Sequence, residues 1–283
     1  GDSRAPFYAV VVSSLANVAL DLWFVAGLGW QVAGAAAATV LSQGAMALFI
    51  LVYAHRRYPL LRLSLKEPLF CREDFAQGLR FGLPPALQFS VTAGGNIALQ
   101  NFMNGFGSHT VAAITTAYRV DTIMLLPIIN LGSAISTMVA QSKGAGEPQR
   151  ARHFWRTGAV MNLVVSLLLM AVMLLFGGKL VALFGVEAEA AAIGRRFFQR
   201  ISLFYVFFGL ACSMRGTIEG TGRVVYSSAV SIAALLLRIA LSYLLAGAFL
   251  NMAIAYAEGL HWIFMVLCFL PFFLRRDRWA QNS

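Results

Sequence analysis

The chain has 283 residues, of which 59% are hydrophobic and 12% charged, and its mean hydropathy of +0.72 excludes an ordinary soluble domain. Its net charge of +10 does not indicate nucleic-acid binding, because 16 of the 22 Lys and Arg residues fall on one side of the predicted membrane spans and four on the other. The sequence therefore predicts a multi-pass protein of the cell inner membrane, with both chain ends in the cytoplasm and basic side chains in contact with lipid headgroups.

The predicted fold class is an all-α polytopic membrane protein. A membrane-spanning helix needs about 20 apolar residues, and the apolar runs do not alternate in polarity as the strands of a membrane barrel would. On this basis the sequence predicts eight transmembrane helices, at 7–26, 32–53, 82–104, 110–140, 157–176, 197–218, 224–246 and 252–274.

The first two predicted spans form a hairpin with polar residues inside it. A tight turn at 27–30 makes the spans antiparallel, so that Asn17 and Thr39 should lie at nearly equal depth on opposite helices. Asp21 lies four residues from Asn17, on the same helical face. An acid within a span usually marks function. One carboxylate, one amide oxygen and one hydroxyl predict a binding site for a proton or a small hard cation.

The third predicted span carries a polar ladder. Gln88, Thr92, Asn96 and Gln100 follow one another at intervals of four residues and keep a polar stripe on one side of the helix. Two interpretations stay open: hydrogen bonding between helices, or the wall of a substrate cavity.

The last predicted hairpin contains two charges at matching depth. Arg238 and Glu258 lie about equally far from the turn at 247–250, so they should meet as a structural ion pair, with a proton relay as the alternative. The three cysteines and His261 have no metal-ligand spacing, so no metal site is expected. The cytoplasmic glycine turns lack the lysine and preceding strand of a nucleotide-binding loop, which argues against ATP as energy source or cofactor.

The first hairpin recurs weakly in the last one, at an offset of 221 residues. Both copies begin and end on the same side, which indicates a parallel repeat as in transporters with two similar halves. The predicted domains are 1–54 (the last two spans of an amino-terminal lobe), 55–80 (a cytoplasmic linker), 81–274 (a complete six-helix lobe) and 275–283 (a basic cytoplasmic tail). If the six spans of 82–274 form one complete half and the last two repeat the first two, four upstream spans of the same protein are expected before Gly1. The chain also opens without an initiator Met or signal peptide, which is typical of an internal fragment.

Several motifs occur in a specific order and spacing: Gly1-Asp2-Ser3-Arg4-x-Pro6, Tyr118-Arg119-Val120-Asp121, Leu126-Pro127-Ile128-Ile129-Asn130-Leu131-Gly132, Gln141-Ser142-Lys143-Gly144-Ala145-Gly146, Arg215-Gly216 and Gly220-Thr221-Gly222. By the order and spacing of these motifs, the whole chain resembles the multidrug and toxic compound extrusion (MATE) family. The resemblance implies spans five to twelve of a twelve-span antiporter, which exports drugs and other amphiphilic compounds in exchange for H⁺ or Na⁺.

The resemblance also bears on the sites. In the branch similar to the DNA-damage-inducible efflux proteins, the cation site uses residues that map onto Asn17, Asp21 and Thr39. Another branch uses a Glu in the seventh span and an Asp in the tenth, and neither acid occurs in 82–104 or 197–218. The expected partners are therefore small amphiphilic substrates, the coupling ion, lipid and the upstream spans.

Two alternative functions make different demands on the side chains within the spans. A lipid or oligosaccharide flippase of the same superfamily would need several cationic side chains in its cavity, and the spans offer only Arg119 and Arg238. An intramembrane enzyme would need two or more acids or a His-rich cluster converging at one depth. The sequence shows only scattered single acids, so a non-enzymatic function is expected.

Overall fold

The computed structural model describes residues 2–59 and 70–274, and these are helical apart from short turns. They divide into two compact units, Gly1–Cys71 and Arg72–Ser283, called unit 1 and unit 2 below. The boundary lies within the predicted linker 55–80. Part of that linker, 60–69, and the predicted basic tail 275–283 lie outside the described residues.

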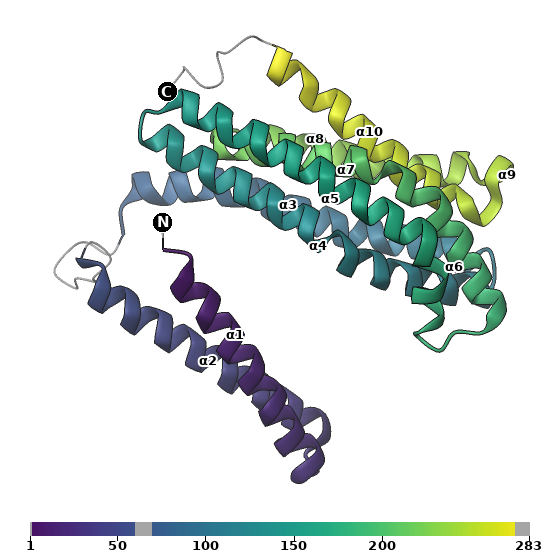
Figure 1. Ribbon diagram of the computed structural model, residues 1–283, viewed down its shortest axis with the longest axis horizontal. Helices are drawn as coiled ribbons and strands as arrows, with labels where there is room; N and C mark the ends of the chain where they lie inside the picture. The colour runs from purple at the N-terminus through teal and green to yellow at the C-terminus, as the bar shows by residue number, and fades with distance from the viewer. Residues whose placement is uncertain (1, 60–69, 275–283) are drawn as a thin grey trace. The chain divides into compact units, whose positions relative to one another are not determined.

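Unit 1 is a helical hairpin. Helix α1 (Arg4–Asp21) continues into a π-helical turn, η1 (Leu22–Gly27), and α2 (Gln31–Arg57) returns antiparallel to it (Figure 1). The turn between them needs a positive φ of 69° at Gly29, a conformation that favours glycine. At the tip, the ring of Phe24 stacks on that of Trp30 at 5.3 Å, and Phe24 is buried.

Asp2 links the two chain ends of the hairpin, opposite its turn, by hydrogen bonds. Asp2 accepts hydrogen bonds from the hydroxyls of Tyr58 at 2.8 Å and Tyr53 at 2.9 Å, as well as from the backbone amide of Arg4 at 3.1 Å. The hydrogen bonds from Tyr58 and then Tyr53 lower the pKa of Asp2 from 3.8 to about 2. The start of α1 is thereby joined to the end of α2.

This contact predicts a pH dependence. Because the pKa of Asp2 is lowered on folding, its carboxylate should stabilise the hairpin fully above pH 3.8 and lose this effect as the pH falls through about 2. Replacing Tyr58 by Phe should move the pKa of Asp2 back toward 3.8, as followed by the carboxyl carbon shift in an NMR titration of Asp-labelled protein. Tyr8→Phe, on an exposed side chain of α1, should leave it unchanged.

Unit 2 contains the other long helices. They are α3 (Arg72–Asn104), α4 (Ser108–Gly144), α5 (Pro148–Ala182), α6 (Ala188–Ile201), a 3₁₀ turn (Ser202–Phe204), α7 (Tyr205–Gly220), α8 (Val224–Leu244), the short α9 (Ala246–Phe249), a second 3₁₀ turn (Leu250–Met252) and α10 (Ala253–Leu274). Helix α3 begins earlier than the predicted span, within the predicted linker, and Glu73 and Asp74 in its first turn favour a helix N-terminus there.

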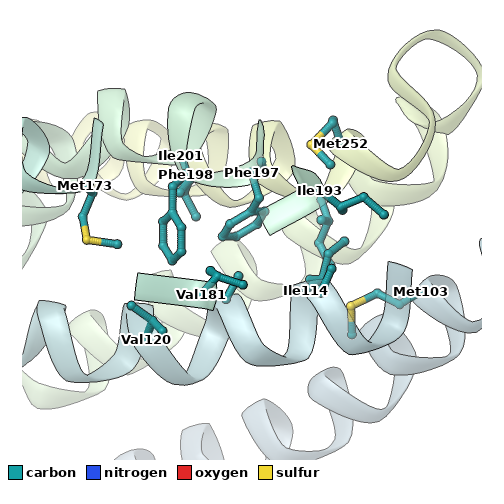
Figure 2. Packing of buried hydrophobic residues seen from close by; sticks show 14 of the residues in the cluster. Met103, Ile114, Val120, Met173, Val181, Ile193, Phe197, Phe198, Ile201 and Met252 are labelled. Atoms are coloured by element: carbon teal, nitrogen blue, oxygen red, sulfur yellow. The ribbon is translucent and has the colours of Figure 1, made fainter. Parts of the chain in front are cut away.

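The core of unit 2 is formed by apolar side chains from its different helices. Phe197, Phe198 and Ile201 of α6 are fully buried and lie close to Ile114 of α4 and Met173 of α5 in the same cluster (Figure 2). Helix α6 can contribute these buried side chains because its apolar residues lie on one side, while Arg195, Arg196 and Arg200 lie on the other.

Helices α4 and α7 approach each other most closely through glycine. A Cβ atom added at Gly216 would lie 2.2 Å from the carbonyl oxygen of Gly132, and one at Gly220 would lie 2.6 Å from that of Ser136. Small residues at helix contacts in membranes allow such approach and favour packing between backbones. This contact holds α7 against α4 along its last turns.

The predicted all-helical membrane fold is confirmed. In the described part of the chain, seven segments are long and apolar enough to span a membrane: Arg4–Gly27, Gln31–Arg57, Ser108–Gly144, Pro148–Ala182, Ala188–Gly220, Val224–Leu244 and Ala246–Leu274. The remaining predicted span, 82–104, lies in the 33-residue helix α3. It is long enough to cross a membrane, but its Gln and Asn residues lower its hydropathy.

Candidate functional site

Unit 1 contains polar atoms without a partner in the middle of its hairpin. Asn17 Nδ2 and Asp21 Oδ1 are both buried, and neither has a hydrogen-bond partner among the described residues. The two residues lie four apart on α1, which places them on the same face. Unsatisfied polar atoms in an apolar environment are costly. Of these two atoms only Asp21 Oδ1 is an acceptor able to take a proton or a cation, because the amide nitrogen of Asn17 is a donor.

Thr39 is placed differently from its predicted partners. Its side chain is exposed, and its hydroxyl donates to the carbonyl oxygen of Ala35 in the same helix at 2.9 Å. The hydroxyl of Ser13 donates to the carbonyl oxygen of Ser42 at 2.9 Å, so four residues further along α1 Asn17 lies nearest the level of Ala38. In the described part of the chain, no hydrogen bond joins Thr39 to Asn17 or Asp21, and this three-residue site stays a prediction.

Unit 2 contains an ion pair inside its membrane segments. The guanidinium Nη2 of Arg238, on α8, contacts the carboxylate of Glu258, on α10, and their side chains are only 12% and 9% exposed. The pair is neutral as a whole, which greatly reduces the cost of placing either charge there. The structural role of this pair stays a prediction, with a proton relay as the alternative.

Two further side chains surround this ion pair. The hydroxyl of Tyr118, on α4, donates to Glu258 Oε2 at 3.2 Å and accepts from Arg238 Nη2 at 3.0 Å. The guanidinium of Arg238 also lies over the Tyr118 ring, 5.6 Å from its centroid. His261 Nδ1 lies 2.7 Å from the backbone oxygen of Glu258 and 3.7 Å from its carboxylate. Three helices thus converge on one pair of charges.

A second buried acid lies close to this cluster. Asp121 is 5% exposed and accepts a hydrogen bond from the hydroxyl of Tyr205, on α7, which is fully buried. Asp121 follows Tyr118 by three residues on α4, so the two share a helical face. Arg119, between them, is exposed. The sequence interpretation missed Tyr118, Asp121 and Tyr205 as members of one cluster, although an acid within a predicted span was itself a signal.

The polar residues of the α3 ladder, Gln88, Thr92, Asn96 and Gln100, differ in their contacts and exposure. Gln88 Oε1 accepts from Arg215 Nη2 of α7 at 3.3 Å, and the Thr92 hydroxyl donates to the backbone oxygen of Gln88 at 2.8 Å. Asn96 is exposed, whereas Gln100 is half-buried and donates to Asn104 at 3.2 Å. Gln88 thus hydrogen-bonds to a neighbouring helix, as the first of the two interpretations of the ladder predicts. Asn96 makes no hydrogen bond to another helix among the residues described.

These features together define a class of protein, a helical multi-pass membrane protein with acids and an ion pair buried between its spans. Groups of three or more His, Cys, Asp or Glu residues able to hold a metal ion do not occur in 2–59 or 70–274.

Comparison with known proteins identifies the family. Residues 84–244 match the family described as MatE. Two relatives from Bacillus subtilis, "Probable multidrug resistance protein YoeA" and "Probable multidrug resistance protein YpnP", are 30% and 29% identical over 83% and 78% of this chain, and the matches cover 52% and 49% of those proteins. A solved structure described as "Crystal structure of MATE in the bent conformation" is similar in fold, with a TM-score of 0.88, 21% identity, and coverage of 97% of this chain and 62% of that one.

The chain belongs to the MatE family, as the motifs of the sequence predicted. It spans about half the length of the curated relatives that it matches.

Proposed function

We propose that the chain is part of an antiporter of the inner membrane, with both ends of the chain in the cytoplasm. It exports drugs and other amphiphilic organic compounds by alternating access, in exchange for H⁺ or Na⁺. The observation that carries the proposal is the buried carboxylate oxygen Oδ1 of Asp21, which has no hydrogen-bond partner among the described residues. The relatives' descriptions as multidrug resistance proteins support the class of substrate.

The charge of Asp21 couples the hairpin to the ion gradient. A carboxylate buried in a span is unfavourable unless it is protonated or paired with a cation. Asn17 supplies an oxygen one helical turn away, and Thr39 is proposed as the third ligand when the hairpin repacks. Binding of H⁺ or Na⁺ removes or balances the charge, so the loaded and empty states of the hairpin differ in free energy. A difference of this kind is what allows an ion gradient to drive a conformational change.

We assign the substrate cavity to the ladder Gln88, Thr92, Asn96 and Gln100. Asn96 is the strongest member, because its amide is exposed and has no partner among the described residues. Gln88 is the weakest, because Arg215 already occupies its oxygen. The upstream spans, proposed as part of the same protein, would complete the cavity.

Replacing Asp21 by Asn in the full-length protein tests the proposal. The variant should abolish export driven by a proton or sodium gradient in proteoliposomes, because its side chain cannot be charged, while its folded yield stays unchanged. Asp74→Asn removes an exposed acid at the start of α3 and serves as the matched control. Undiminished gradient-driven export by Asp21→Asn would exclude Asp21 as the coupling residue.

A further inference from the structure

An open groove of about 470 Å³ lies at one end of unit 2, where three elements meet. It is lined by the first part of α3, the last turn of α4 and the turn between α7 and α8. Two cationic side chains, Arg80 and Lys143, face it together with Phe81, and no acidic side chain does. Its lining includes none of the residues of the buried ion pair.

In the described part of the chain, no acidic side chain pairs with the two cations of the groove. Lys143 is half-buried, and its ammonium donates to the carbonyl oxygen of Thr221 at 3.0 Å. An ammonium has three donors, and in the described residues the other two have no acceptor. Glu219, close to Thr221 in sequence, is already engaged by Arg215 at 2.7 Å and by Ser227 at 2.8 Å. Arg80 has no ion pair within the described part of the chain.

The groove lies at the level of a membrane surface. Its lining residues fall at or just outside the ends of three predicted spans, which begin at residue 82, end at residue 140 and begin at residue 224. This is the side with the excess of Lys and Arg, where phospholipid phosphates meet the protein. Phe81 is 42% exposed and presents an apolar surface beside the two cations.

The glycines of the turn leave the backbone accessible at this point. Gly222 has a positive φ of 86°, which favours glycine, and a Cβ atom there would have only the Phe81 ring within 4 Å. Gly144, at the end of α4, has no neighbour within 4 Å of its Cβ position. With its volume of about 470 Å³, the groove therefore has room for a group the size of a phosphate.

We infer that this groove binds the phosphate of an anionic phospholipid through Arg80 and Lys143, with Phe81 against the glycerol and upper acyl region. This inference goes beyond the proposed export and does not depend on it. A free phosphate ion shares the same chemistry, but it would gain nothing from Phe81 or from the position of the groove at the membrane surface.

Native mass spectrometry of the full chain in detergent tests the inference, with phosphatidylglycerol, phosphatidylcholine and inorganic phosphate as probes. Each Lys or Arg near an anionic lipid surface contributes enough to change affinity about fivefold. Arg80→Gln and Lys143→Gln should each weaken phosphatidylglycerol binding by about this factor, and the double variant by about 25-fold. Arg150→Gln combined with Arg156→Gln, on α5 outside the groove, removes the same charge and should have little effect.

The outcomes separate the alternatives. Loss of phosphatidylglycerol binding confined to the groove variants supports the site. An equal loss in the α5 control, or equally tight binding of phosphatidylcholine, would overturn it, because net charge or general lipid contact would then explain the binding. Displacement of the lipid by an equal concentration of inorganic phosphate would assign the groove to the free ion. If Lys143→Gln does not fold, Arg80→Gln decides alone, since the Arg80 side chain is exposed and makes no ion pair in the described residues.

Discussion

Replacing Arg238 by Met, with Glu258 left in place, should lower the free energy of unfolding by about 3–5 kcal/mol. The variant leaves a buried carboxylate whose remaining side-chain contacts among the described residues are with Tyr118 and His261, and neither of these carries a fixed positive charge. Glu258→Gln should have a comparable effect, because it leaves the guanidinium of Arg238 without its counter-ion. Unfolding midpoints in denaturant-titrated detergent micelles measure both losses.

The double variant distinguishes a coupled pair from two independent charges. Removing both charges should cost less than the two single losses added together, since neither partner is then left alone. Arg119→Met is the matched control on α4, because Arg119 is exposed, and it should change stability little. Strictly additive losses would show that Arg238 and Glu258 do not stabilise each other, and would favour a role for each with another partner.

Replacing Gly216 by Ala should be the second large perturbation, with a loss on the order of 1–3 kcal/mol or more. The added methyl group would lie 2.2 Å from the carbonyl oxygen of Gly132, a distance that real Cβ atoms do not show. Since the obstacle is backbone and not a flexible side chain, α7 and α4 must move apart to accommodate it. Thermal unfolding of the purified chain followed by circular dichroism measures the effect.

Gly94→Ala on α3 is the control for this substitution. Its Cβ position has no neighbour within 4 Å, so the same chemical change meets no obstacle there. It should leave stability unchanged or raise it slightly, because alanine favours the helix. Equal stability of the Gly216→Ala and Gly94→Ala variants would mean that the α4–α7 contact does not limit the packing of unit 2.

Contacts between helices that are consecutive in the chain are the features that the sequence predicts best. The contact of Arg238 with Glu258 could be anticipated because the two lie in consecutive antiparallel spans, at matching distances from one turn. The hydrogen bond from Tyr205 to Asp121 joins residues 84 apart, and that from Tyr118 to Glu258 joins residues 140 apart. No local periodicity encodes such pairings, since they depend on how non-consecutive helices pack.

The first hairpin shows a different limit. Counting residues from the turn placed Asn17 opposite Thr39, whereas the bond from Ser13 to Ser42 places it nearest Ala38. Counting residues gives the correct depth only if both helices of the hairpin are α-helical, but Leu22–Gly27 is a π-helix and holds more residues in each turn. The composition of the sequence gives no sign of such a turn, so the residue predicted to face Asn17 differs by about one position from the residue observed at its level.

The same π-helical turn affects how sequences of this family should be aligned. The amide of Leu28 bonds to the carbonyl oxygen of Trp23, five residues back, where an α-helix would use the fourth. The turn is therefore equivalent to an α-helix with a single-residue insertion. A relative whose hairpin is α-helical throughout would match this chain only if a one-residue gap is placed within 22–27. A gap placed elsewhere would rotate the following residues by roughly 100° about the helix axis and pair the wrong positions with Asp21.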